Sequence, residues 1–170
     1  LFLPYTLEDK QYTLGNELPV AEFYDRMRNG SMPTTSQYNA EDAAGLWEPY
    51  LKQGVDILHI AFSSGLSGSY NSARLAAEDM REKYPERKIT VVDSLSASLG
   101  EGLLVWYAAK LKKEGKTMEE LTSWLEENKL HLCHVFTVND LFHLYRGGRV
   151  SKATAILGTM INIKPMLHVD

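Results

Sequence analysis

Hydroxyl side chains and glycines gather at two places where an apolar segment of the sequence gives way to a helical pattern. Residues 63–69 read Ser-Ser-Gly-Leu-Ser-Gly-Ser, and residues 94–98 read Ser-Leu-Ser-Ala-Ser. A helix N-terminus has unpaired N–H groups and a partial positive charge, so it favours an anion, and serine hydroxyls add further donors. This pattern predicts a small anion site, and its candidate residues are Ser64, Ser67, Gly68 and Ser94.

A third group of hydroxyls, at Thr34, Thr35 and Ser36, lies in a polar stretch that also precedes a helical pattern. Asn39 is well placed to cap that helix. Serines and threonines before a helix are most often simple caps, so this alternative stays open for each cluster taken alone.

The Ser-Gly turn at residues 63–69 lacks features of two familiar catalytic loops. No lysine follows its glycines, which excludes a phosphate-binding P-loop. A nucleophile elbow requires Gly-x-Ser-x-Gly, but Ser69 stands where the last glycine belongs. A serine hydrolase that acts on a small ester through Ser67 remains an alternative, and so does an interaction domain with a capped-turn surface. Asp93 ends a strand without a paired carboxylate or an ordered base, which favours a turn-capping role.

The histidines and the single cysteine do not form an evident metal site. His131, Cys133 and His134 are close in sequence, but strand alternation puts His134 on the opposite face from the other two. His59 lies in an apolar segment and is interpreted as a hydrogen-bonded core residue. A single cysteine excludes an internal disulfide and favours a reducing, cytoplasmic location.

The order of the elements predicts an α/β fold, in which a parallel sheet is flanked by helices. Strands of this sheet are predicted at residues 55–62, 89–93 and 131–138. Helices are predicted at residues 18–29, 39–53, 70–84, 103–114, 118–128 and 151–161. Pro49 is expected to kink or divide the second of these helices. Shorter strands are expected at residues 1–5 and 11–14, joined by a turn around residues 8–10, and at residues 163–169.

Charge and hydropathy exclude two classes of partner. The 170 residues have a formal net charge of −4 with both signs interspersed, so a nucleic-acid partner is not expected. No apolar segment approaches the roughly 20 residues that a membrane-spanning helix requires, so stable membrane insertion is not expected. The last predicted strand is cut off at the final residue, which indicates a fragment of a longer protein.

The three clusters resemble the motifs of the DegV family, in the family's order along the chain. The matching segments are Thr34-Thr35-Ser36-Gln37, residues 62–73, Val92-Asp93-Ser94, the Arg-Gly-Gly-Arg-Val-Ser of residues 146–151, and Ile163-Lys164-Pro165. Together they span nearly the whole chain, and their combination is specific although no single motif is. Two departures are the absence of the family's opening strand, which usually carries an Asp-Ser pair, and Tyr38 where many members have proline.

The resemblance implies a fatty-acid-binding carrier rather than an enzyme. It implies that Thr35 and Ser67 hold the carboxylate of a long-chain fatty acid, while two domains enclose the acyl chain. A separate fatty acid kinase then phosphorylates the bound lipid to an acyl-phosphate for phospholipid synthesis in the bacterial cytoplasm, so the carrier itself requires no cofactor and no metal. Positions expected to support the site are Thr34, Ser36, Ser64, Gly68, Ser94 and Arg149.

The resemblance also implies a division into domains. Residues 1–150 are expected to form the α/β domain with the carboxylate-binding loops, and residues 151–170 to begin a second, incomplete domain. Apolar residues of the late helix are candidate contacts of the acyl chain, or else belong to a core between domains: Ile156, Leu157, Met160 and Ile161.

Overall fold

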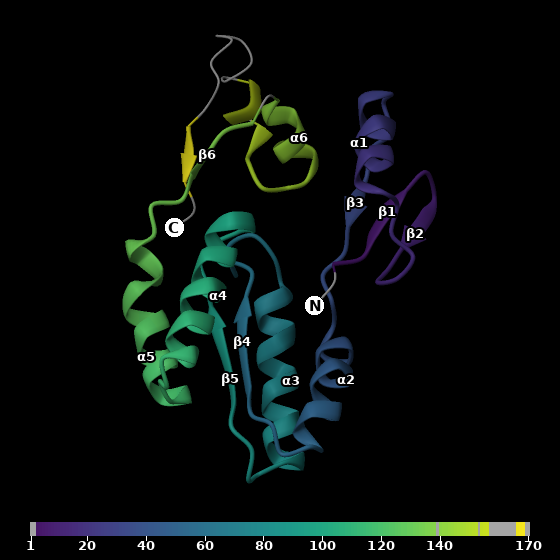
Figure 1. Ribbon diagram of the computed structural model, residues 1–170. Coiled ribbons are helices and arrows are strands. Elements are labelled where there is room, and N and C mark those ends of the chain that lie inside the picture. The colour runs from purple at the N-terminus through teal and green to yellow at the C-terminus, as the bar shows by residue number, and fades with distance from the viewer. Residues whose placement is uncertain (1–2, 139, 153, 157–165, 169–170) are drawn as a thin grey trace. The chain divides into compact units, whose positions relative to one another are not determined.

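The computed structural model describes residues 3–138, 140–152, 154–156 and 166–168. The chain forms two compact units. The first unit comprises Leu1–Ile57 and Asn71–Ile89, and the second comprises Leu58–Tyr70 and Thr90–Asp170. Helices alternate with short strands (Figure 1), which confirms the predicted α/β class.

The first unit contains a three-stranded antiparallel sheet in the order β2-β1-β3. Its strands are β1 (Tyr5–Leu7), β2 (Lys10–Tyr12) and β3 (Thr34–Thr35). Glu8 and Asp9 form the two-residue turn between β1 and β2, and both have positive φ, as a tight hairpin turn requires. The turn was predicted, whereas β3 lies in a stretch interpreted only as a loop, because two residues carry no periodicity.

The helices of this unit are α1 (Val20–Arg28), α2 (Ala40–Leu51) and most of α3 (Ser69–Lys83). A reciprocal capping box of Asn39 and Asp42 begins α2, since Asp42 N donates to Asn39 Oδ1 over 2.8 Å and Asn39 N to Asp42 Oδ2 over 2.9 Å. The predicted division of this helix at Pro49 is wrong, because α2 continues to Leu51, and a kink at Pro49 stays a prediction. Pro49 lies in the last turn of α2, where its missing N–H removes one of the helix's backbone hydrogen bonds without ending the helix.

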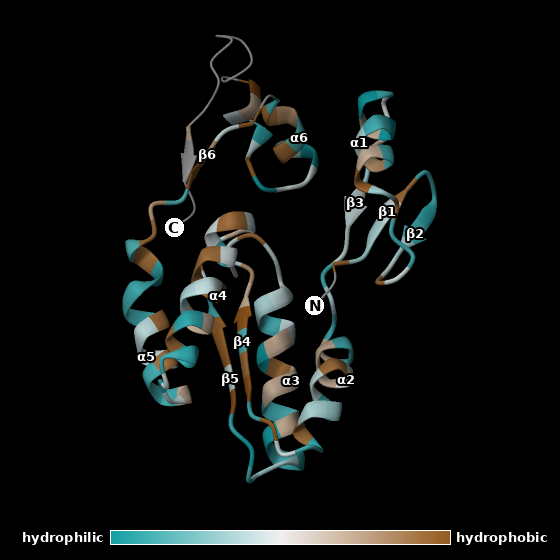
Figure 2. Cartoon of the chain, viewed as in Figure 1, coloured by the Kyte–Doolittle hydropathy of each residue, from teal (hydrophilic) through white to brown (hydrophobic). Residues whose placement is uncertain are grey.

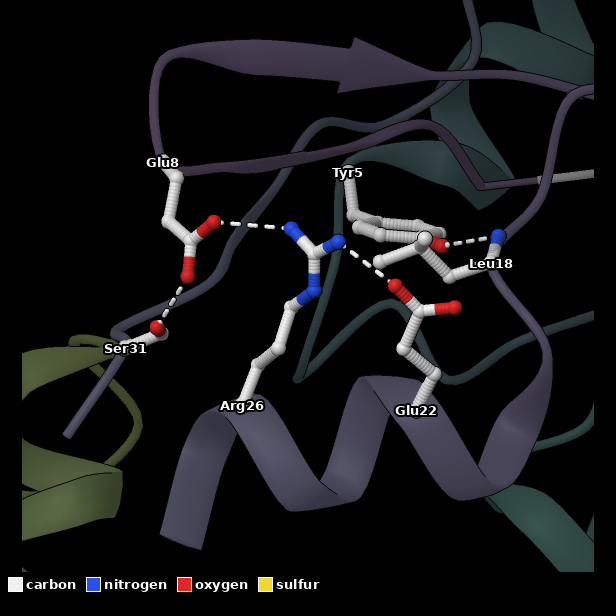
Figure 3. Close-up of polar contacts among 6 residues, drawn as sticks. All are labelled: Tyr5, Glu8, Leu18, Glu22, Arg26 and Ser31. Carbon is white, nitrogen blue, oxygen red and sulfur yellow. Dashed lines mark hydrogen bonds and ion pairs between the residues drawn. The ribbon is translucent and has the colours of Figure 1, made fainter. Parts of the chain in front are cut away.

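Side chains of α1 hold the hairpin in place (Figure 3). Arg26 Nη1 lies 2.8 Å from Glu8 Oε2, and Ser31 Oγ donates to the other oxygen of Glu8. The Ser31 hydroxyl and the Arg26 guanidinium lower the pKa of Glu8 below its usual range. Leu18 N donates to the hydroxyl of Tyr5 over 3.0 Å. The Tyr5 ring also packs edge-on against the ring of Phe23 in α1. Strand β1, which carries Tyr5, is therefore held by these side-chain contacts as well as by its backbone pairing with β2 and β3.

Two parallel strands, β4 (Ile57–Ala61) and β5 (Ile89–Asp93), form the central sheet, and all but their first residues belong to the second unit. Ile57 N donates to Lys88 O over 2.8 Å at one end of the pair, and Ser94 N donates to Ala61 O over 3.1 Å at the other. Both strands point the same way in Figure 1. Their carboxyl ends therefore lie beside each other, as the sequence predicted.

Two helices, α4 (Ser98–Lys113) and α5 (Met118–Asn128), complete the core of the second unit. The buried cluster consists of Val92, Leu104, Ala108 and Leu125. Figure 2 shows the apolar colour of β4 and β5. The predicted capping box of Thr117 and Glu120 is present at the start of α5. None of the helices in the described part of the chain has both the length and the apolar composition that crossing a membrane requires.

The predicted third parallel strand is wrong. A 3₁₀ turn at Lys129–His131 is followed by the short β6 (Val135–Phe136), which pairs antiparallel with β7 (Leu167–His168) in a separate sheet. Exposed and half-buried residues alternate through residues 131–138, as in a strand covered on one face, whereas a central parallel strand is covered on both. The helix α6 (Leu141–Arg146) follows, and parts of the predicted elements at residues 151–161 and 163–169 lie outside the described residues.

Helix α4 begins at Ser98, whereas the sequence predicted a start at about residue 103. The prediction was late because two glycines, Gly100 and Gly102, favour a turn over a helix. Gly100 is required by packing rather than by a turn. A Cβ atom there would lie 2.5 Å from Nδ1 of His134. That nitrogen is buried and has no hydrogen-bond partner among the described residues, and the His134 ring also lies 5.9 Å from the ring of Phe136, centroid to centroid.

We expect opposite results from replacing the two glycines of α4 by alanine. A Cβ atom on Gly102 would meet nothing within 4 Å. Since alanine is favoured over glycine inside a helix, Gly102→Ala should raise the free energy of unfolding by about 0.5–1 kcal/mol. Gly100→Ala should lower it by about 1–3 kcal/mol, because the His134 ring must leave its place. Urea unfolding measures both, and a stabilising Gly100→Ala would contradict the contact.

Candidate functional site

The turn after β4 closes on Ser63, which is fully buried. Ser63 Oγ accepts from Gly65 N over 3.2 Å, and Ser63 O accepts from Leu66 N and Ser67 N, each over 3.1 Å. Ser63 N donates to Ser96 O over 2.9 Å, which ties this turn to the one that follows β5. The turn is therefore a fixed loop whose amides are largely engaged inside the molecule.

Asp93 joins the two turns through one carboxylate oxygen. Asp93 Oδ1 accepts from Ser64 N and from Leu95 N, each over 3.1 Å. This geometry confirms the turn-capping role expected for Asp93. The sequence did not predict that the carboxylate would cap both turns at once.

The hydroxyl of Ser67 lies at the start of α3. Ser67 Oγ accepts from Ser69 N over 3.2 Å and lies 2.9 Å from Ser69 Oγ. Ser67 is half-buried, whereas Ser69 is fully buried. Ser67 is thus the hydroxyl of this pair that a ligand can reach.

One backbone amide of residues 63–69 is left to donate to an anion. The amides of Ser63, Ser64, Gly65, Leu66, Ser67 and Ser69 already donate within the molecule. Gly68 is exposed, and its amide has no acceptor among the described residues. Gly68 therefore remains the amide of this turn that can face an anion.

The turn after β5 is closed by its own serines. Ser96 N donates to Ser94 Oγ over 3.1 Å, and Ser94 Oγ donates to Ser96 O over 3.2 Å. Leu95 and Ser98 have positive φ, which costs a residue with a side chain about 1–2 kcal/mol. The buried Ser94 hydroxyl thus holds the turn, and a contact between Ser94 and a ligand stays a prediction.

The threonine cluster belongs to the first unit. Thr35 pairs with Tyr5 in β1, and Ser36 N donates to Pro4 O over 2.9 Å. Thr34, Thr35 and Ser36 are all exposed. Successive side chains of a strand point to opposite faces, so Thr34 and Thr35 cannot face one ligand together. Since Ser67 belongs to the second unit, a carboxylate shared by Thr35 and Ser67 stays a prediction.

Ser67 has no described contact of the kind a nucleophile needs. The described partner of its hydroxyl is Ser69, and no histidine or carboxylate in the described part of the chain hydrogen-bonds to it. No group of three or more histidine, cysteine, aspartate or glutamate residues that could hold a metal occurs among the residues described. The serine-hydrolase alternative therefore gains no support from this geometry.

Comparison with known proteins identifies the family. The model of the DegV family of uncharacterised proteins matches residues 1–170. The chain belongs to the DegV family. A DegV domain-containing protein of Clostridium perfringens is 52% identical over 157 residues, which cover 92% of this chain and 54% of that relative. One from Lactococcus lactis is 44% identical over 144 residues, 85% of this chain and 50% of the relative. The chain thus spans about half the length of the curated relatives it matches.

Solved DegV structures share the fold. A fatty-acid-binding DegV family protein of Thermus thermophilus is 36% identical with a TM-score of 0.81, over 99% of this chain and 59% of its own. DegV of Bacillus subtilis, a fatty acid binding protein, is 33% identical with a TM-score of 0.77, over 99% and 59%. The fatty acid kinase B3 protein of Streptococcus pneumoniae, loaded with linoleic acid, is 25% identical with a TM-score of 0.80, over 96% and 58%.

The later DegV motif begins at Arg146, the last residue of α6. Arg149 is exposed, its N donates to Leu144 O over 2.9 Å, and its guanidinium donates to Gly147 O. These bonds fix the turn and leave the rest of the guanidinium at the surface. Of the candidate acyl-chain contacts, Ile156 is 38% exposed. The other three, Leu157, Met160 and Ile161, lie outside the described residues.

His59 of this DegV chain makes stability depend on pH. Burial in β4 lowers the pKa of His59 to about 4, so the folded protein binds its proton more weakly than the unfolded chain does. Stability from this group is complete above pH 6.5 and is lost as the pH falls toward 4, by at most about 1.4 kcal/mol per pH unit. We expect urea unfolding at pH 7.5 and 4.5 to differ by about 2 kcal/mol less in His59→Gln than in the wild type.

The exposed His131 provides the control for His59. The variant His131→Gln should keep the wild-type difference between the two pH values. An equal pH dependence in His59→Gln and in the wild type would mean that His59 is not the group responsible.

Proposed function

We propose that this chain is the carboxylate-binding part of a bacterial long-chain fatty acid carrier. The observation that carries the proposal is the half-buried Ser67 hydroxyl, which is held at the start of α3 by Ser69 in a turn whose backbone amides, apart from that of Gly68, donate within the molecule. Family membership and the fatty acids bound by the T. thermophilus and B. subtilis relatives support it. In this proposal Ser67 and Thr35 donate to the carboxylate, and Gly68 contributes its amide.

The head group and the acyl tail contribute differently to the free energy of binding. Two hydroxyl bonds to a carboxylate contribute about 1.5–3 kcal/mol each. Burial of a tail of about a dozen methylenes contributes on the order of 10 kcal/mol before the costs of binding. The tail therefore sets most of the affinity, and the hydroxyls set which end of the lipid lies at the turn.

The carrier is proposed to act with a kinase rather than as an enzyme itself. A separate fatty acid kinase phosphorylates the bound acid to an acyl-phosphate for phospholipid synthesis in the cytoplasm, and the carrier has no cofactor other than its lipid. The S. pneumoniae fatty acid kinase B3 protein, at 25% identity, supports this partner. The proposed domains are residues 1–150 and the start of a second domain at 151–170, between which the acyl chain lies. The supporting positions remain Ser36, Ser64, Ser94 and Arg149, whereas Thr34 lies on the opposite face of β3 from Thr35.

Native mass spectrometry of the purified protein tests the proposal. A bound species should be found at one copy per chain, and organic extraction should identify it as a fatty acid. Labelling of Ser67 by a fluorophosphonate probe would instead favour a serine hydrolase. A protein that neither co-purifies with a fatty acid nor takes up added oleic acid would contradict the carrier function.

A further inference from the structure

Ser69 contributes a second hydroxyl to the candidate site. Its side chain is fully buried, and its Oγ lies 2.9 Å from Ser67 Oγ. Its backbone N–H also donates to Ser67 Oγ, over 3.2 Å. Two polar groups of one residue thus converge on the single hydroxyl oxygen of Ser67.

Proton accounting determines which of the two hydroxyls donates. A serine hydroxyl has one proton and two lone pairs. If Ser67 donated to Ser69, the proton of the buried Ser69 would need another acceptor, and none lies within hydrogen-bond distance among the described residues. A buried hydroxyl proton without an acceptor is strongly disfavoured. Ser69 is therefore the donor and Ser67 the acceptor.

The hydroxyl proton of Ser67 is the part of this group that a ligand can use. Both lone pairs of Ser67 Oγ are occupied, one by Ser69 N–H and the other by Ser69 Oγ–H. The oxygen has no lone pair left to accept from a ligand or to attack one. Its own proton has no acceptor among the residues that the structure describes, and it points away from the two groups that occupy the lone pairs.

We propose that Ser69 is a positioning residue that makes Ser67 a hydrogen-bond donor only, and thereby selects a carboxylate head group over an alcohol of the same chain length. The selection follows because a bond to a charged oxygen is about twice as strong as one to a neutral oxygen. An amine head group, which brings donors of its own, finds no acceptor at Ser67. This inference rests on the proposed function, in which Ser67 contacts the ligand.

The test compares oleic acid with oleyl alcohol, which share one chain and differ in the head group. In the purified protein, Ser69→Ala should lower the ratio of acid affinity to alcohol affinity by about tenfold, while alcohol affinity changes less than about twofold. Ser69→Thr, which keeps the hydroxyl, should restore the ratio. Ser72→Ala is the matched control, because Ser72 is another buried serine of α3, and it should leave the ratio unchanged.

A second variant and a second readout keep the inference testable if alanine at this buried position prevents folding. Ser69→Cys keeps the size of the side chain and only a weak donor, so it should also lower the ratio. The carbon-13 resonance of oleic acid labelled at its carboxyl carbon should titrate at higher pH when bound to either variant than to the wild type, because Ser67 is no longer held as a donor to the charged form.

The outcomes separate the inference from the proposed function. If Ser67→Ala lowers the ratio while Ser69→Ala and Ser69→Cys do not, the positioning role is overturned and the carrier function stands. Equal losses of acid and alcohol affinity in the Ser69 variants would show a merely structural role and also overturn it. If Ser67→Ala itself leaves the ratio unchanged, the proposed carboxylate contact fails.

Discussion

The double variant Thr35→Ala/Ser67→Ala should lose its fatty acid while keeping its fold. Each hydroxyl is proposed to donate one bond to a charged oxygen, and such bonds contribute about 1.5–3 kcal/mol apiece. Loss of both corresponds to an affinity about a hundredfold lower or more. Organic extraction of the purified variant should recover no lipid, and titration with oleic acid should show the weaker binding directly.

The fold of the double variant can be anticipated from the contacts of the two side chains. Thr35 is exposed and holds β3 to Tyr5 through the backbone, so its loss should cost little. Loss of the Ser67 hydroxyl removes the acceptor of the buried Ser69, which should lower the free energy of unfolding by about 1–3 kcal/mol. Circular dichroism at the assay temperature checks that the variant remains folded.

The two neighbouring threonines should differ in their effect on oleic acid binding. Thr34 and Thr35 point to opposite faces of β3, so one of them at most can meet the carboxylate. Thr35→Ala alone should therefore weaken oleic acid binding by about tenfold more than Thr34→Ala does. Unchanged lipid retention in the double variant would refute the carboxylate assignment, and the reverse order of the two single variants would move it to Thr34.

Local signals predicted the elements whose ends are set by their own residues. Helix α5 occupies Met118–Asn128 as expected, because the Thr117 and Glu120 capping box satisfies its first amides from within the sequence. Strand β5 occupies Ile89–Asp93 as expected, because a branched apolar segment is followed at once by serine-rich turn chemistry. Neither prediction depended on a contact with a distant part of the chain.

Elements set by distant partners were not predictable in the same way. Strand β3 exists because two residues pair with β1, and β6 pairs with β7 rather than with the central sheet. The approach of His134 to Gly100 is another such contact, and it accounts for a glycine inside α4. Glycine is a poor helix former in isolation, so the sequence alone favoured a turn at that position.

The same difference between local signals and distant contacts holds for the candidate site. The sequence located the hydroxyl clusters, because serine and glycine before a helix have a local physical meaning. It did not show that Ser69 donates to Ser67, because several hydroxyls of the turn could pair locally. It also did not show that one oxygen of Asp93 caps both turns, since the bond from Ser64 N to Asp93 Oδ1 depends on β4 and β5 lying side by side. An aspartate at the end of a strand was the available signal, and it was assigned to one turn only.

Asp93→Ala should be among the most destabilising single changes near the site. The substitution leaves the amides of Ser64 and Leu95 without their shared acceptor, and hydrogen bonds to a charged group contribute about 1.5–3 kcal/mol each. Because Ser64 is exposed and water can replace one bond, we expect the free energy of unfolding to fall by about 2–4 kcal/mol. Oleic acid affinity should fall with it, since the turn that presents Ser67 loses its connection to the turn after β5.

Asp93→Asn separates the geometry of this connection from its charge. The asparagine Oδ1 can accept from the same two amides, so the free energy of unfolding should fall by only about 1 kcal/mol. The change also removes a negative charge beside a proposed anion site, so oleic acid affinity should hold or rise. Urea unfolding and oleic acid titration of the two variants together decide the matter. Equal losses of stability in both would mean that the charge of Asp93, rather than its place between the two amides, stabilises the turns.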